Sequence, residues 1–180
     1  MDALQAILSR KSVRSYQTRP VESEKLELLL KSANKAPKAG EMHITVVENN
    51  TLLSEINHKT LNAMKSSGND FLVSRANLPG YQPLYGAPML ILFSVQQTNP
   101  FGQATASCAA ANTAIAATAL GLGSCYVVSP IPTICREHAI AEKLKIPEGY
   151  SPACGIIIGY KDSDKFSTPE QKTDNINYCR

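Results

Sequence analysis

The chain has 180 residues and a formal net charge of +3, from 18 lysines and arginines against 15 aspartates and glutamates. Its length predicts a single domain that comprises residues 1–180. A hydrophobic fraction of 43% excludes an intrinsically disordered chain. The charge excess is too small to indicate a nucleic-acid-binding protein.

Hydrophobic periodicity predicts five helices, at residues 2–10, 22–35, 52–66, 103–120 and 132–144. In the first helix, Leu4, Ile7 and Leu8 share one apolar face. Short apolar or β-branched runs predict four strands, at residues 44–47, 89–95, 122–128 and 153–159. Residues 69–88 contain three prolines and two glycines, so we expect them to be irregular. Because the helices and strands do not repeat as βαβ units, we predict an α+β fold.

A long uncharged block occupies the middle of the chain, since no Asp, Glu, Lys or Arg occurs between Arg75 and Arg136. A membrane span over residues 104–128 is disfavoured, because this segment is mostly small or polar and prolines interrupt the block. We expect part of the block to face another subunit. The alanines of the 103–120 helix would allow close approach of a second helix, at Ala109, Ala110, Ala111, Ala114, Ala116 and Ala117.

The cysteines argue against a disulfide framework or a zinc site, because they are odd in number, irregularly spaced and without a C-x-x-C pair. The three histidines are far apart in the sequence and also lack metal-ligand spacing. At the N-terminus the basic residues follow the apolar ones, which is the reverse of a secretory signal peptide. We therefore expect a reduced, cytoplasmic protein without a bound metal.

One basic cluster lies at the end of the first predicted helix, where Arg10, Lys11, Ser12 and Arg14 could surround a phosphate group. Alternatively, Arg10 and Lys11 only complement the negative end of that helix. No dinucleotide fingerprint, Walker loop, G-x-S-x-G or H-E-x-x-H motif is present. If the chain is an enzyme, we expect a cofactor to supply its reactive atom.

Four groups of residues occur in a characteristic order: ILSRKSVRSY at 7–16 with APKAG at 36–40, YGAPMLIL at 85–92, AATALGLGSCY at 116–126, and IPEGY at 146–150 with Gly159-Tyr160. Together they resemble the FMN-dependent nitroreductase family. The resemblance implies a sandwich in which a central, mostly antiparallel sheet is flanked by helices. It also implies a homodimer with FMN at two equivalent sites between the subunits, without a nucleic-acid or membrane partner.

The family's FMN-binding positions fall in three segments of this sequence and at one lysine near its end: Arg10, Lys11, Ser12, Arg14, Pro37, Lys38, Ala39, Gly40, Tyr126, Val127, Val128, Ser129 and Lys172. By resemblance, the first segment binds the phosphate and the polar end of the flavin, and Lys172 joins the phosphate site. The second would reach the flavin from the partner subunit, and the third would line one flavin face.

The activity that the resemblance implies is transfer of a hydride from NADH or NADPH to FMN, and then reduction of a flat, electron-poor acceptor by ping-pong exchange. A nitroaromatic, a quinone or a free flavin would fit as the acceptor. Arg14 is the candidate for a cation that stabilises negative charge on the reduced flavin. Reductive dehalogenation and flavin breakdown on the same fold remain alternatives.

The sequence departs from the family pattern after Gly40. The family commonly has Asn there, followed by Gln with Pro and an aromatic residue, whereas this chain has Glu41, Met42, His43 and Ile44. This departure keeps open a third function, a flavin-binding module without turnover.

Overall fold

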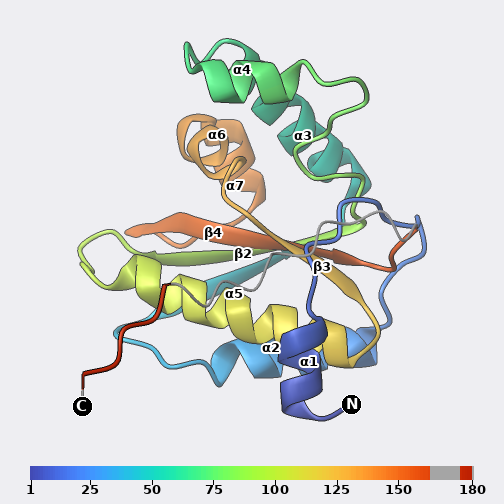
Figure 1. Cartoon of the computed structure of the whole chain (residues 1–180). Helices are drawn as coiled ribbons and strands as arrows, with labels where there is room; N and C mark the ends of the chain where they lie inside the picture. Colours follow the sequence, from blue (N-terminus) through green and yellow to red (C-terminus); the bar gives the residue numbers. More distant parts are fainter. Residues whose placement is uncertain (163–174, 180) are drawn as a thin grey trace.

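A four-stranded antiparallel sheet lies at the centre of the computed structural model, which describes residues 1–162 and 175–179 (Figure 1). The strands lie side by side in the order β1 (Met42–Val47), β2 (Met89–Gln96), β4 (Tyr150–Gly159) and β3 (Gly123–Val127). Each neighbouring pair is antiparallel. The predicted α+β class with a mostly antiparallel sheet is confirmed, although β1 and β4 begin two and three residues earlier than expected.

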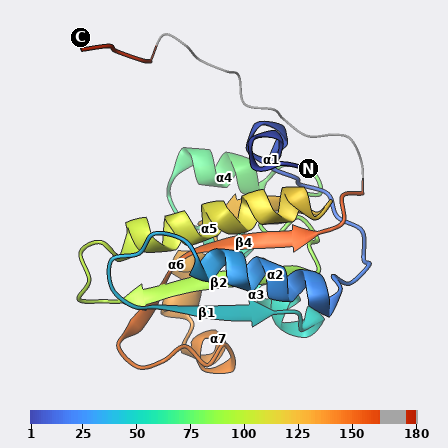
Figure 2. The same ribbon diagram turned by 90° about the horizontal axis from the view of Figure 1, so that it is seen from below.

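Helices cover both faces of the sheet, as Figures 1 and 2 show. One side holds three helices, α1 (Ala3–Ser9), α2 (Ser23–Asn34) and α5 (Gly102–Ala119). The other side holds α3 (Asn50–Lys65), α4 (Asp70–Ala76), α6 (Ile131–Arg136) and α7 (His138–Lys143). In the part of the chain that is described, no helix is long and apolar enough to cross a membrane.

The two sheet faces form two hydrophobic cores because successive strand side chains point to opposite sides. On β2, Ile91 and Phe93 pack with the alanines of α5, whereas Leu90 and Leu92 pack on the other face. Every residue of β2 from Met89 to Val95 is buried. The middle of the uncharged block is therefore interior to this one chain, whereas residues 77–80 and 96–98 of the block are exposed.

The alanines of α5 do not serve the contact that we predicted for them. Ala109, Ala110, Ala114 and Ala117 are buried within the chain, against α2 and the sheet. Small side chains do permit a close helix contact here, but the neighbour is α2 of the same chain. Ala111 alone of the six alanines is exposed, so a subunit contact through most of this stripe is excluded.

Two local predictions differ from the structure. Residues 69–88 are not wholly irregular, since α4 begins after Asn69, whose side chain accepts a hydrogen bond from Leu72 N. The predicted helix 132–144 is two helices, with Glu137 at the break in a non-helical conformation (φ −92°, ψ 88°). On α1 only Ala6 is buried, and the apolar face of that helix is exposed.

Candidate functional site

The basic segment that follows α1 lies along β3. Ser12 forms a parallel bridge with Ser124, and Val13 N donates a hydrogen bond to Ser124 O at 2.9 Å. Farther along, the buried Tyr16 hydroxyl donates to Val13 O at 2.8 Å. Burial raises the pKa of Tyr16, so this hydroxyl remains a donor. The segment is thereby fixed to the edge of the sheet.

Because the segment is extended, alternate side chains point to opposite sides of it. Arg10, Ser12 and Arg14 occupy alternate positions of the segment, so their side chains leave it on the same side. Burial raises the pKa of the Cys125 thiol, and Arg14, Ser12 and Arg10 act in the opposite direction. The structure therefore brings together three of the four predicted residues of this segment.

Lys11 points elsewhere. It lines a separate cavity of about 270 Å³ beside Gly121, with Ser9 and Lys161 among its neighbours. The predicted phosphate cluster is thus divided between two sides of one extended segment. Sequence spacing alone did not show this division, because four polar residues within five positions fit a turn as well as a strand.

The second predicted segment lies near the first turn of α5. Ala39 N donates to Thr105 Oγ1 at 3.0 Å, and Asn99 Nδ2 donates to Ala39 O at 2.6 Å. Lys38 forms an ion pair with Glu41 at 3.8 Å, and both side chains are largely exposed. Pro37 and Gly40 are also exposed.

The basic segment lies near the opposite end of α5, where Thr118 lines the same cavity as Lys11. Thr118 follows Thr105 by 13 positions, which span about 20 Å of helix at about 1.5 Å per residue. Figure 2 shows the loop between α2 and β1 near the start of α5, and α1 toward its other end. Within one chain, residues 37–40 are therefore not part of the arginine cluster.

The third predicted segment comprises the end of β3 and the connection to α6. The Tyr126 hydroxyl lies 3.3 Å from Ser107 Oγ and 3.5 Å from Gln103 Nε2, so its ring lies against α5. Val127 is buried, Val128 is 52% exposed and Ser129 is half-buried. Lys172 lies outside the described residues.

An additional cation near the arginine cluster was missed by sequence analysis. Arg75, in the last turn of α4, is the fourth group that lowers the pKa of Cys125 against the effect of burial. Its Nη2 donates to the Tyr85 hydroxyl at 2.9 Å. The sequence does contain a signal for the helix that carries Arg75, which is the N-cap pair Asn69-Asp70. The prolines and glycines after the helix predicted a loop instead.

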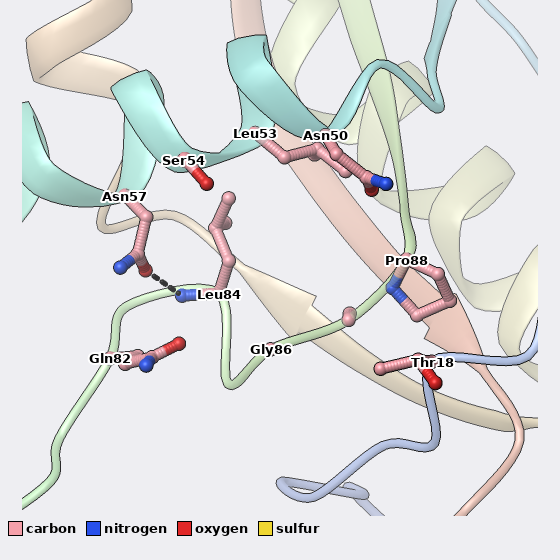
Figure 3. Close-up of a pocket in the computed structure, with 10 residues that line it drawn as sticks. Thr18, Asn50, Leu53, Ser54, Asn57, Gln82, Leu84, Gly86 and Pro88 are labelled. Carbon is pink, nitrogen blue, oxygen red and sulfur yellow. Dashed lines mark hydrogen bonds between the residues drawn. The ribbon is translucent and has the colours of Figure 1, made fainter.

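The loop that carries Tyr85 is anchored from α3. An uncharged cavity of about 250 Å³ lies between α3 and residues 82–88, and Figure 3 shows Asn57 and Gln82 at its wall. Asn57 Oδ1 accepts a hydrogen bond from Leu84 N at 3.0 Å. Among the described residues, no group of three or more His, Cys, Asp or Glu side chains could hold a metal ion.

Contact between the basic segment and β3 requires a glycine at position 123. A Cβ added there would lie 2.9 Å from Val13 Cγ2 and 3.0 Å from Val13 Cβ. We therefore expect Gly123→Ala to destabilise the protein by about 1–3 kcal/mol, because it overpacks this contact. Urea unfolding of the variant measures the loss.

Combining Gly123→Ala with Val13→Ala removes the two Val13 methyl groups from the contact. The double variant should then be more stable than the sum of the two single losses predicts. Simple addition of the two losses would contradict the proposed clash.

Known proteins that are similar to this chain in sequence and those that are similar in fold belong to the same family. The family model described as "Nitroreductase family" matches residues 7–160. A protein of Methanothermobacter thermautotrophicus named "Putative NADH dehydrogenase/NAD(P)H nitroreductase" is 30% identical, over 89% of this chain and 78% of its own length. One of the same name from Archaeoglobus fulgidus is 28% identical, over 91% and 88%.

Solved structures show the same fold. The crystal structure of a nitroreductase with bound FMN from Bacteroides fragilis superposes with a TM-score of 0.88 at 26% identity, over the full length of both chains. A nitroreductase from Desulfitobacterium hafniense gives a TM-score of 0.91 at 23% identity, also over both full lengths. The resemblance found in the sequence is thereby confirmed, and the chain belongs to the nitroreductase family.

Proposed function

We propose that this chain is an FMN-dependent oxidoreductase that uses NADH or NADPH to reduce a flat, electron-poor acceptor. The observation that carries the proposal is the placement of Arg10, Ser12 and Arg14 at alternate positions of the extended segment that is bridged to β3. The bound FMN of the Bacteroides fragilis nitroreductase and the names of the two archaeal relatives support it.

The residues of this cluster fit FMN. Two guanidinium groups and a hydroxyl supply the donors that a phosphate dianion needs. The half-buried positions of Arg10 and Ser12 partly shield these contacts from water. Val128 and Ser129 carry no charge and are not fully buried, so they would suit an apolar, flat ring near the same edge of the sheet.

We also propose that two copies of the chain are needed for each site. Residues 37–40 and the arginine cluster lie at opposite ends of α5, so they can meet at one flavin only if they come from different subunits. The exposed apolar side chains of α1 supply a surface for such a homodimer. Leu4, Ile7 and Leu8 are 71%, 48% and 72% exposed in the single chain.

In this site, bound FMN would accept a hydride from NAD(P)H and deliver electrons to a nitroaromatic, quinone or flavin by ping-pong exchange. Arg10 and Ser12 would hold its phosphate. Arg14 would place a positive charge against the polar edge of the ring, which favours uptake of electrons there. Lys38 pairs with Glu41, so it offsets the negative charge where the sequence departs from the family pattern.

The protein is expected to work as one domain in the cytoplasm. All five cysteines are free in the structure, which suits a reducing compartment.

The purified protein tests this proposal directly. We expect flavin absorption, or its appearance after reconstitution, with about one FMN per chain, and steady-state oxidation of NAD(P)H when a quinone is added. A protein that does not take up FMN would overturn the proposal. FMN uptake without any NAD(P)H oxidation would instead favour the flavin-binding module without turnover.

A further inference from the structure

Arg75 makes two contacts with aromatic side chains of the loop before β2. Its Nη2 donates to the Tyr85 hydroxyl at 2.9 Å, and its guanidinium carbon lies 5.3 Å from the centre of the Tyr81 ring. The two rings pack edge to face, with centres 5.7 Å apart and planes at 85°. Arg75 therefore holds both tyrosines in one arrangement.

The backbone of Tyr85 is held in an unusual conformation. Its φ is +51°, in the left-handed region that residues other than glycine rarely adopt. Turn hydrogen bonds from Tyr85 N to Gln82 O and from Ala87 N to Leu84 O stabilise this conformation, as does the Asn57 anchor in Figure 3. Such positions cluster at functional sites, where surrounding contacts fix a side chain in one direction.

The side chain of Tyr85 points from this loop toward Arg14. The Arg14 guanidinium carbon lies 6.0 Å from the centre of the Tyr85 ring, at the limit of a cation–π contact. Arg75 and Arg14 thus contact one tyrosine, the first at its hydroxyl and the second over its ring. Hydrogen bonding to a cation polarises the phenol and, above all, fixes the position of the ring.

We propose that Arg75 is a positioning residue of the flavin site, which fixes the Tyr85 ring and thereby the guanidinium group of Arg14. This inference rests on the proposed function, since Arg14 is the residue placed against the polar edge of FMN. Arg75 also adds a third guanidinium group near Cys125, with Arg10 and Arg14. The positioning of Arg14 and the positive charge of Arg75 itself both favour electron uptake and FMN binding at the polar edge of the flavin.

A simpler role for Arg75 is to stabilise the negative C-terminal end of α4. Arg136 provides a matched control, because it also lies in the last turn of a short helix, α6, and is exposed. If Arg75 only supports its helix, Arg75→Gln and Arg136→Gln should both lower thermal stability slightly and leave FMN binding unchanged.

The test compares Arg75→Gln, Tyr85→Phe and the double variant with the wild-type protein. We expect each single variant to weaken FMN binding by about three- to tenfold, which is the usual range for a cation–π contact or hydrogen bond. The midpoint potential of bound FMN should fall in both. The double variant should lose little more than either single one, because Arg75 acts through the Tyr85 hydroxyl. Arg75→Lys retains a charged donor and should recover much of the affinity.

Two results would overturn the inference. One is that Arg75→Gln changes neither the FMN dissociation constant nor the potential. The other is that the effects of Arg75→Gln and Tyr85→Phe simply add. If the wild-type protein itself binds no FMN, the proposed function fails and the inference fails with it, whereas wild-type binding with unaffected variants overturns the inference alone.

Discussion

Arg10→Ala is expected to weaken FMN binding by about 1.5–3 kcal/mol, the range for a hydrogen bond to a charged group. The phosphate dianion would lose a guanidinium group, and no neutral side chain at position 10 can replace it. Riboflavin lacks the phosphate, so its affinity should change much less. Titration of the apoprotein with each flavin, followed by fluorescence quenching, gives both dissociation constants.

Lys11→Ala is the matched control for this variant. It removes the same charge from the adjacent position, but Lys11 lines the separate cavity beside Gly121. Its effect on FMN should therefore be clearly smaller than that of Arg10→Ala. Equal losses for FMN and riboflavin in Arg10→Ala would show that Arg10 only completes the end of α1, the alternative that the sequence left open.

The sequence predicted most elements because their signals are local. In α2, Leu29 and Ala33 recur at helical spacing and are buried. The strand β2 is apolar on both faces from Met89 to Phe93 because both of its faces are covered by helices. Such a run lacks the alternation of polar and apolar residues that marks a half-buried strand. Its length and its flanking residues were nevertheless sufficient to identify it as a strand.

The elements that were missed depend on weaker or non-local signals. The helix α4 has only seven residues, and the neighbouring prolines and glycines predicted a loop. The break at Glu137 has no proline or glycine to mark it, so the periodicity continued through it. Packing of α6 against β4 and α3 decides that break, and packing is not readable from local spacing.

The candidate site shows the same limit. The arginine segment could be identified from a few consecutive residues, because its charge pattern is local. The division of this segment into two sides depends on the packing of Val13 on Gly123, which only the folded structure shows. Arg75 could not be identified in sequence at all, since its relation to Arg14 depends on a tyrosine ten residues farther along a folded loop.

Leu8→Glu is expected to dissociate the proposed dimer and abolish FMN binding. Leu8 is 72% exposed in the single chain, and a two-fold interface would bury it twice. Burying one leucine contributes about 1.5–3 kcal/mol, so the two copies together contribute about 3–6 kcal/mol. A buried glutamate without a partner adds a further penalty. Light scattering measures the mass, and flavin absorbance measures the retained FMN.

Phe71→Glu is the matched control, because Phe71 is also 72% exposed but lies on α4, across the sheet from α1. It changes the charge and the hydrophobic surface by a similar amount, so it should leave the mass unchanged. A Leu8→Glu protein that remains a dimer would place the interface away from α1. A wild-type monomer that binds FMN would show that residues 37–40 are not required from a second chain, and that the site is complete within one.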